Sequence, residues 1–86
     1  MEEIRSAAAD IQVYPNPANG TLNVQLEKRV NNGTLTLFDM NGKAVLSQAI
    51  NGNSAQINLS SLAAGNYILH LVENDVANAG IQVIKN

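Results

Sequence analysis

The sequence predicts an all-β domain, an antiparallel β-sandwich of about seven short strands. Turn-forming residues recur at separations of 9 to 13 residues, near Gly20, Gly33, Gly42, Gly52, Gly65 and Asn74. Apolar and polar residues alternate between these turns, which is typical of strands buried on one face. No window sustains the apolar period of about 3.6 residues that marks an amphipathic helix. Short strands at such even spacing favour a sandwich.

The chain begins with a segment unlike the rest. Residues 1–10 are charged and then rich in alanine, and they show no strand alternation. We therefore expect a flexible lead-in there. A chain of 86 residues has room for a single hydrophobic core, so residues 11–86 are expected to form one domain.

Two prolines separate the first two predicted strands. Residues 11–14 alternate as a short strand, which must end at Pro15 and Pro17 because proline lacks the N–H of a sheet ladder and fixes φ. A turn at residues 18–20 leads into residues 21–27, where every second residue is apolar. This alternation predicts an antiparallel strand buried on one face.

Three Asn-Gly signals divide the middle of the chain. Residues 31–33 and residues 51–53 each predict a turn between strands. Asn41-Gly42 suits a two-residue hairpin of type I′, because both central residues of that turn need a positive φ. Asp39 is expected to accept backbone hydrogen bonds across the hairpin turn. The strands beside these turns would span residues 34–40, 43–50 and 55–59.

The stretch from Leu62 to Tyr67 is expected to carry the chain from one sheet to the other. Leu62 would fill the core, and Gly65 would take a positive φ that other residues adopt only at a cost. The ring of Tyr67 would be buried while its hydroxyl returns to the backbone a few residues upstream, as in the tyrosine corner of sandwich domains. The alternative is a tyrosine in a plain hairpin.

Two strands are predicted after this corner. Residues 67–73 are apolar at nearly every position, as in a central strand covered on both sides. His70 would share a face with Ile68 and Val72 and remain partly exposed. The last strand would span residues 76–85, with Gly80 at a bulge.

The composition argues against several functions. Aromatic residues make up only 3% of the chain, so a face that stacks on sugars or bases is not expected. The formal net charge is -2 and the five basic residues are dispersed, so we expect no nucleic-acid partner. Without cysteine there is neither a disulfide nor a thiolate site. No run approaches the roughly 18 apolar residues of a membrane span, so we expect no transmembrane segment.

The sequence offers no catalytic or metal centre. His70 is the only histidine, and the carboxylates form no calcium-binding loop of the D-x-D-x-D kind. Glu73 and Asp75 flank a predicted turn, where a weak cation site is the alternative to a pair that keeps the hairpin soluble. We therefore expect no enzymatic activity and no cofactor.

Three motifs follow one another along the chain, and each of them alone would be weak. They are Tyr14-Pro15-Asn16-Pro17, Leu37-Phe38-Asp39-Met40-Asn41-Gly42-Lys43 and Leu62-Ala63-Ala64-Gly65-Asn66-Tyr67. Together with the short tail over residues 81–86, this ordered set resembles the C-terminal sorting domain of the type IX secretion system of Bacteroidetes. The family's motif positions fall on Pro15, Asn16, Pro17, Asp39, Gly42, Lys43, Gly65 and Tyr67. The resemblance covers residues 11–86 and implies an immunoglobulin-like antiparallel β-sandwich of about seven strands.

The resemblance implies that the domain is an address label. Cargo would cross the inner membrane by a signal peptide, fold in the periplasm, and pass the outer membrane through the translocon and its shuttle components. A surface sortase of the cysteine-protease type would then remove the domain, commonly joining the cargo to anionic lipopolysaccharide. The cargo would finish at the cell surface or in the medium.

The resemblance also assigns two functional segments. The recognition strand would comprise Gly80, Ile81, Gln82, Val83, Ile84, Lys85 and Asn86. Cleavage would fall in the lead-in, at Ser6, Ala7, Ala8, Ala9 or Asp10. If the last strand lies at a sheet edge, its backbone can be read by strand addition. The alternative is a closing strand needed only for stability.

Two other classes of function remain open at this point. One is an adhesive or carbohydrate-binding sandwich retained in a mature surface protein, which would need an exposed aromatic platform or a calcium cage. The other is a spacer, or a module that forms a homodimer through an edge strand.

Overall fold

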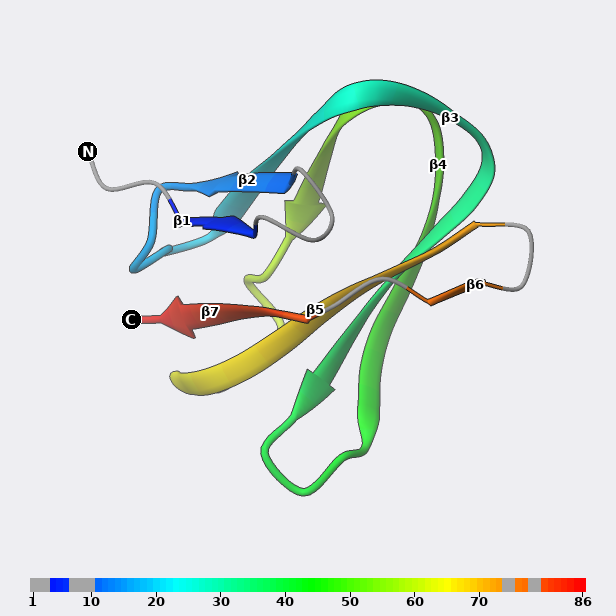
Figure 1. Cartoon of the computed structure of the whole chain (residues 1–86). Coiled ribbons are helices and arrows are strands. Elements are labelled where there is room, and N and C mark those ends of the chain that lie inside the picture. The colour runs from blue at the N-terminus through cyan, green and yellow to red at the C-terminus, as the bar shows by residue number, and fades with distance from the viewer. Residues whose placement is uncertain (1–3, 7–10, 74–75, 78–79) are drawn as a thin grey trace.

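The computed structural model describes residues 4–6, 11–73, 76–77 and 80–86, and every element within these ranges is a β-strand (Figure 1). Five strands have four residues or more, and β1 and β6 are shorter. The elements are β1 (Ile4–Ser6), β2 (Ile11–Tyr14), β3 (Thr21–Asp39), β4 (Ala44–Asn58), β5 (Gly65–Glu73), β6 (Val76–Ala77) and β7 (Ile81–Lys85). All pairs of strands are antiparallel, which confirms the predicted all-β antiparallel class.

The strands form one curled sheet whose two halves share β3 and β4. In one half the order is β1, β2, the first part of β3 and the last part of β4, with Leu22 opposite Ile57. In the other half β3 lies between β4 and β5, and β5 pairs on its far side with β6 and β7. The halves face each other because the β3–β4 ribbon bends sharply between them (Figure 1).

The predicted turns at residues 31–33 and 51–53 are both wrong, because the strands continue through them. Val30 lies opposite Gly52 and Gly33 opposite Ile50, with register shifts on either side. The chain bends there because Asn32 adopts a φ of 57° and Gly52 a φ of 109°. The two asparagine-rich segments thus face each other as one corner of a long ribbon. The four strands predicted between residues 21 and 59 are therefore two long bent strands, β3 and β4.

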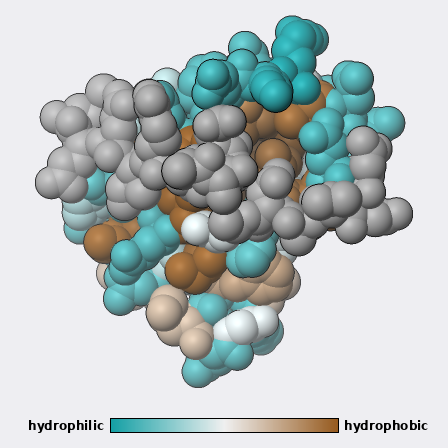
Figure 2. Space-filling model, viewed as in Figure 1, coloured by the Kyte–Doolittle hydropathy of each residue, from teal (hydrophilic) through white to brown (hydrophobic). Residues whose placement is uncertain are grey.

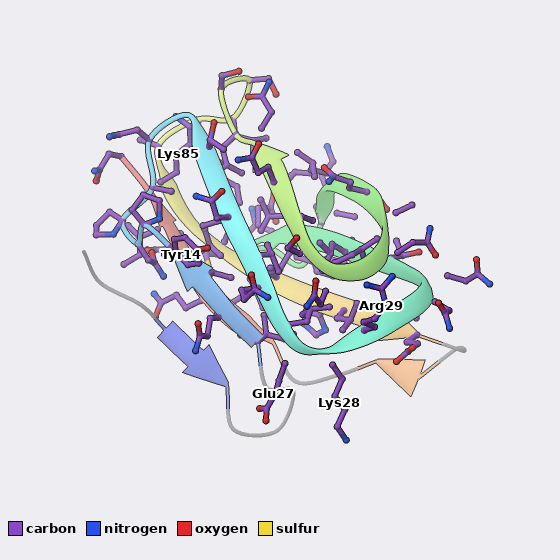
Figure 3. All side chains as sticks on the ribbon, turned by 90° about the horizontal axis from the view of Figure 1, so that it is seen from above. Tyr14, Glu27, Lys28, Arg29 and Lys85 are labelled. Carbon is purple, nitrogen blue, oxygen red and sulfur yellow. The ribbon has the colours of Figure 1, made fainter. Side chains whose placement is uncertain are left out.

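Hydrogen bonding and packing fix this corner. The backbone N–H of Asn32 donates to Oδ1 of Asn51 at 2.8 Å. Gly33 is buried, and a Cβ placed on it would lie 2.5 Å from Cγ1 of Val30. Glu27, Lys28 and Arg29 are exposed around the bend (Figure 3), where hydrophilic side chains gather at the top of the molecule (Figure 2).

The predicted type I′ hairpin at Asn41-Gly42 is also wrong in its turn type. Gly42 has a φ of 83°, but Asn41 is not among the described residues with a positive φ. Gly42 N–H donates to the Asp39 carbonyl at 3.0 Å, so the tight turn closes one residue earlier than predicted. The register shifts between Leu37 and Phe38, which lie opposite Leu46 and Ala44. Val45 is therefore the extra residue on β4, and it forms a bulge.

The core lies between the two halves and consists almost entirely of aliphatic side chains. Tyr67 is its one ring and is 7% exposed. Within the described part of the chain, seventeen buried hydrophobic residues form the cluster: Ile11, Val13, Ala18, Leu22, Val24, Leu26, Val30, Leu35, Leu37, Ile50, Ile57, Leu59, Tyr67, Leu69, Leu71, Ile81 and Val83. The chain has only two tyrosines, one phenylalanine and no tryptophan, so aliphatic side chains have to build this core.

Both ends of the chain differ from the predicted elements. Strand β1 pairs with β2, with Ile4 opposite Val13, inside the segment expected to be a lead-in. The predicted last strand is divided into β6 and β7. Ala77 lies opposite Val72 and Ile81 opposite Leu69, so the divided strand carries one more residue than β5 over this interval. Residues 78 and 79 lie outside the described part of the chain, so the bulge at Gly80 stays a prediction.

Candidate recognition surface

The loop containing Pro15, Asn16 and Pro17 lies along the outer edge of β7. Both X-Pro peptide bonds of this loop are cis. The side chain of Asn16 is 2% exposed. Its Nδ2 donates to the carbonyl of Gln82 at 3.0 Å, and its Oδ1 accepts the N–H of Ile84 at 2.9 Å. One amide group therefore occupies the place that a neighbouring strand would take.

Ala18 continues this cover toward the end of the chain. Its N–H donates to the Ile84 carbonyl at 2.7 Å, and its carbonyl accepts the N–H of Asn86 at 2.8 Å. Ala18 and Lys85 form a short parallel bridge. The outer edge of β7 is thus engaged at four backbone groups, while the inner edge pairs with β5. The edge that strand addition would require is not free.

The side chains of the terminal segment divide into two sets. Ile81 and Val83 are 2% and 0% exposed and belong to the core. Gln82 and Asn86 are exposed, and Ile84 and Lys85 are half-buried. Gly80 is exposed, but a Cβ on it would lie 2.5 Å from Cγ2 of Ile68, so the chain passes closely over β5. A partner can reach Gln82, Ile84 and Asn86 without disturbing the core.

The turn from Asp39 to Lys43 is organised by a carboxylate, as predicted. Oδ1 of Asp39 accepts the N–H of Asn41 at 2.9 Å and that of Lys43 at 3.0 Å. The N–H of Asp39 also donates to the Lys43 carbonyl at 2.9 Å. The predicted role of Asp39 in capping the backbone is confirmed.

The predicted tyrosine corner is confirmed. The hydroxyl of Tyr67 donates to the carbonyl of Ala63 at 2.6 Å, four residues upstream. Gly65 has a φ of 154°, and Leu62 packs against the core. The corner joins β4 in one half to β5 in the other, as expected. The prediction that β5 is covered on both sides is wrong, because Ile68, His70 and Val72 are only half-buried.

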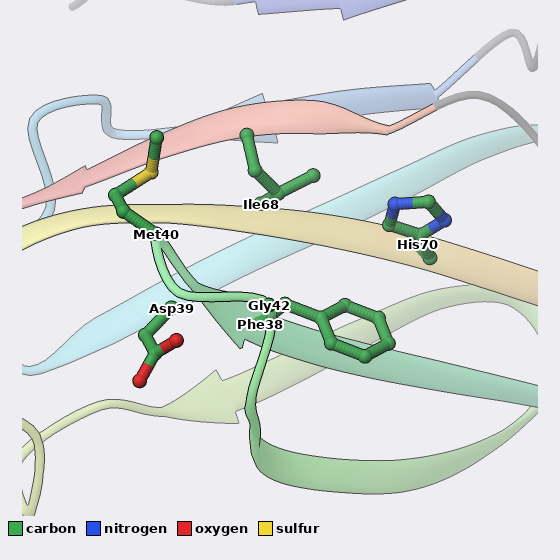
Figure 4. Close-up of a pocket in the computed structure, with 6 residues that line it drawn as sticks. All are labelled: Phe38, Asp39, Met40, Gly42, Ile68 and His70. Atoms are coloured by element: carbon green, nitrogen blue, oxygen red, sulfur yellow. The ribbon is translucent and has the colours of Figure 1, made fainter.

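An apolar hollow of about 420 Å³ opens on the outer face beside the turn from Asp39 to Lys43 (Figure 4). Phe38, Asp39, Met40, Gly42, Ile68 and His70 line it. Met40 is 64% exposed, and the rings of Phe38 and His70 meet edge to face with centroids 5.2 Å apart. His70 therefore lies where the sequence placed it, on a half-exposed strand face.

The structure describes only some of the residues considered above for a weak cation site and for cleavage. No group of three or more His, Cys, Asp or Glu residues that could hold a metal occurs in the described part of the chain. Asp75, predicted beside Glu73 at a turn, lies outside that part. Ser6 ends β1 opposite Ile11, and Ala7 to Asp10 lie outside the described residues.

The motif residues, far apart in the sequence, lie in one row across the sheet. Asp39 on β3 is opposite Tyr67 on β5, and Tyr67 is opposite Val83 on β7. The amide of Asn16 then bonds to the residues on either side of Val83. The parts played by Asn16 and Ala18 were not predicted. An asparagine held between two prolines was the only signal in the sequence.

The sequence of the chain shows which family it belongs to. A family model described as secretion system C-terminal sorting domain matches residues 12–85. The chain belongs to the sorting-domain family of the type IX secretion system. Domains of this family are secretion signals and are not catalytic.

The sorting domain also resembles part of a larger curated protein. It is 30% identical over 76 residues to an endo-acting ulvan lyase of Formosa agariphila. The match covers 87% of this chain and 14% of the lyase. Most of the lyase sequence therefore lies outside the match. No helix of the described residues has the length and apolar character to cross a membrane.

Proposed function

We propose that this sorting domain directs a cargo protein across the outer membrane through the type IX secretion system and is then cleaved off by a surface sortase. The observation that carries the proposal is the row formed by Asp39, Tyr67, Val83 and Asn16. Three motifs separated in the sequence have no shared catalytic chemistry, but they jointly fix one face and one strand. A shape held in this way is what a receptor needs when it must recognise many cargoes by one feature.

The finer steps of the route follow from family membership and are part of the proposal. Cargo crosses the inner membrane, folds in the periplasm and meets the translocon and its shuttle components through residues 80–86. Residues 11–86 are the signal, and residues 1–10 contain the cleavage region, from Ser6 to Asp10. The sortase is a cysteine protease that releases the cargo or joins it to anionic lipopolysaccharide at the cell surface.

We also propose that the curled sheet is a variant of the immunoglobulin-like sandwich. The corner at Tyr67, two facing halves and an aliphatic core support this relationship. The long bent strands β3 and β4 replace the four separate strands that the sequence suggested.

An export assay tests the function. The chain is fused behind a periplasmically exported reporter in a host that has the type IX system, beside the same reporter without the domain. We expect the reporter outside the cell and shortened by the domain when the full chain is present, and in the periplasm when residues 82–86 are deleted. Equal amounts of external reporter with and without the domain would refute the proposal.

We further propose that the domain forms a homodimer through the free edge of β4. Among the described residues β4 pairs with β3 alone, and no residue from Ala44 to Asn58 is charged. Charged side chains commonly protect exposed edges against pairing, and this edge lacks them. Light scattering across a range of concentrations tests the proposal. A monomer at every concentration would contradict it.

A further inference from the structure

The loop at Pro15 to Ala18 suggests a role that turn formation alone does not explain. A turn needs only to reverse the chain, but this one places a buried amide and two backbone groups along β7. In an antiparallel strand, alternate residues direct their N–H and C=O groups to opposite edges. Gln82, Ile84 and Asn86 direct theirs outward, because the groups bonded by the loop belong to these residues.

The amide of Asn16 satisfies both strand groups that face residue 16. The Gln82 carbonyl requires a donor and the Ile84 N–H requires an acceptor. A carboxylate at neutral pH can accept but not donate, and an alanine can do neither. Asparagine in its one productive orientation does both, and at 2% exposure it does so with little water present.

We infer that Asn16 is a positioning residue for the terminal strand. It holds the outer edge of β7 closed, so that a partner reads this strand through exposed side chains rather than by adding a strand of its own. The inference rests on the proposed sorting function, and it names how the signal is presented.

The side chains available to that partner lie on the outer face of β3, β5 and β7. Gln82 is opposite Ile68, and Ile68 is opposite Phe38, which lines the hollow. Ile84 lies opposite Asn66. The terminal segment thus continues the outer face of β3 and β5, and four of its outward backbone groups are already bonded by the loop.

Hydrogen exchange in the full chain tests the positioning role directly. With Asn16→Ala we expect the Ile84 amide to exchange about tenfold faster, because it loses its hydrogen bond, while the neighbouring Val83 amide, which faces β5, keeps its protection. Asn58→Ala is the matched control. Oδ1 of Asn58 accepts two hydrogen bonds from Ser60 and does not contact β7. Unchanged exchange at Ile84 in folded Asn16→Ala would overturn the inference.

The export assay then tests whether the position of the terminal strand affects recognition by the secretion system. We expect Asn16→Ala and Asn16→Asp to lower the external reporter at least about fivefold at equal folded content, and Asn58→Ala to leave it unchanged. If Asn16→Ala unfolds the chain, Asn16→Asp, which keeps one of the two bonds, carries the test. Undiminished or increased export with an opened edge would overturn the inference in favour of strand addition, while the proposed function would stand. Failure of the unmutated chain to export the reporter would instead refute the function itself.

Discussion

Replacing Gly33 by alanine tests the bent ribbon that joins the two halves of the sheet. A Cβ at this position would lie 2.5 Å from Cγ1 of Val30, 3.0 Å from Cγ2 of Ile50 and 3.3 Å from Cδ1 of Leu71. Contacts this short force the neighbours to move, and overpacking of a core costs about 1 to 3 kcal/mol. Reduced freedom of the unfolded chain returns roughly 0.4 to 1 kcal/mol. We expect a net loss of about 1.5 kcal/mol in the free energy of unfolding.

Gly20→Ala is the matched control for this substitution. A Cβ on Gly20 would meet nothing within 4 Å, and its φ is not in the left-handed region. We expect this variant to gain roughly 0.5 kcal/mol from the unfolded state alone. Urea unfolding followed by circular dichroism should therefore separate the two variants by about 2 kcal/mol, or roughly 10 °C in Tm. Equal shifts for both variants would show that residues 31–33 form an ordinary exposed turn.

Two further substitutions test the corner and the loop against β7. Tyr67→Phe removes the hydroxyl that donates to Ala63 and should lower the free energy of unfolding in urea by about 1 kcal/mol. The control Tyr14→Phe should change it by less than roughly 0.5 kcal/mol. Equal effects of the two substitutions would show that the hydrogen bond of the corner does not stabilise the fold. Asn16→Asp should be least stable relative to the unmutated chain at pH 7, because burial beside the Gln82 carbonyl raises the pKa of the introduced carboxyl above its unfolded value and the ionised form cannot donate. The difference should shrink as the pH falls through that raised pKa, since the protonated form can donate and accept. A difference independent of pH would contradict the two-bond geometry.

Local chemistry made part of this structure predictable. Proline ended β2, glycine with a positive φ and a tyrosine built the corner, and the Asp39 carboxylate capped a turn two residues away. Each of these features depends on residues close together in the sequence, so that composition and spacing were sufficient. Apolar alternation likewise identified the buried faces of β2 and β3, because the side-chain period of a strand is fixed at two residues.

The bends in β3 and β4 were not predictable for a physical reason. An Asn-Gly pair reports that the backbone can adopt a positive φ, but it does not report whether the chain then reverses or only changes direction. Val30 faces Gly52, and Asn32 bonds to Asn51, across 19 residues or more. Whether an Asn-Gly segment forms a turn or a corner therefore depends on the distant segment that it pairs with, and not on its own sequence.

The same limit explains why the role of Asn16 was missed. Its partners lie 66 and 68 positions further along the chain. An amide side chain carries a donor and an acceptor in one plane, as a peptide group does, so it can replace one residue of a neighbouring strand. The replacement works only when β7 is in register with β5, since a shift of one residue would turn Gln82 and Ile84 toward the core and present Val83 to the loop. The loop therefore discriminates between registers, and the terminal strand can show its outward side chains only in a sheet that has folded correctly.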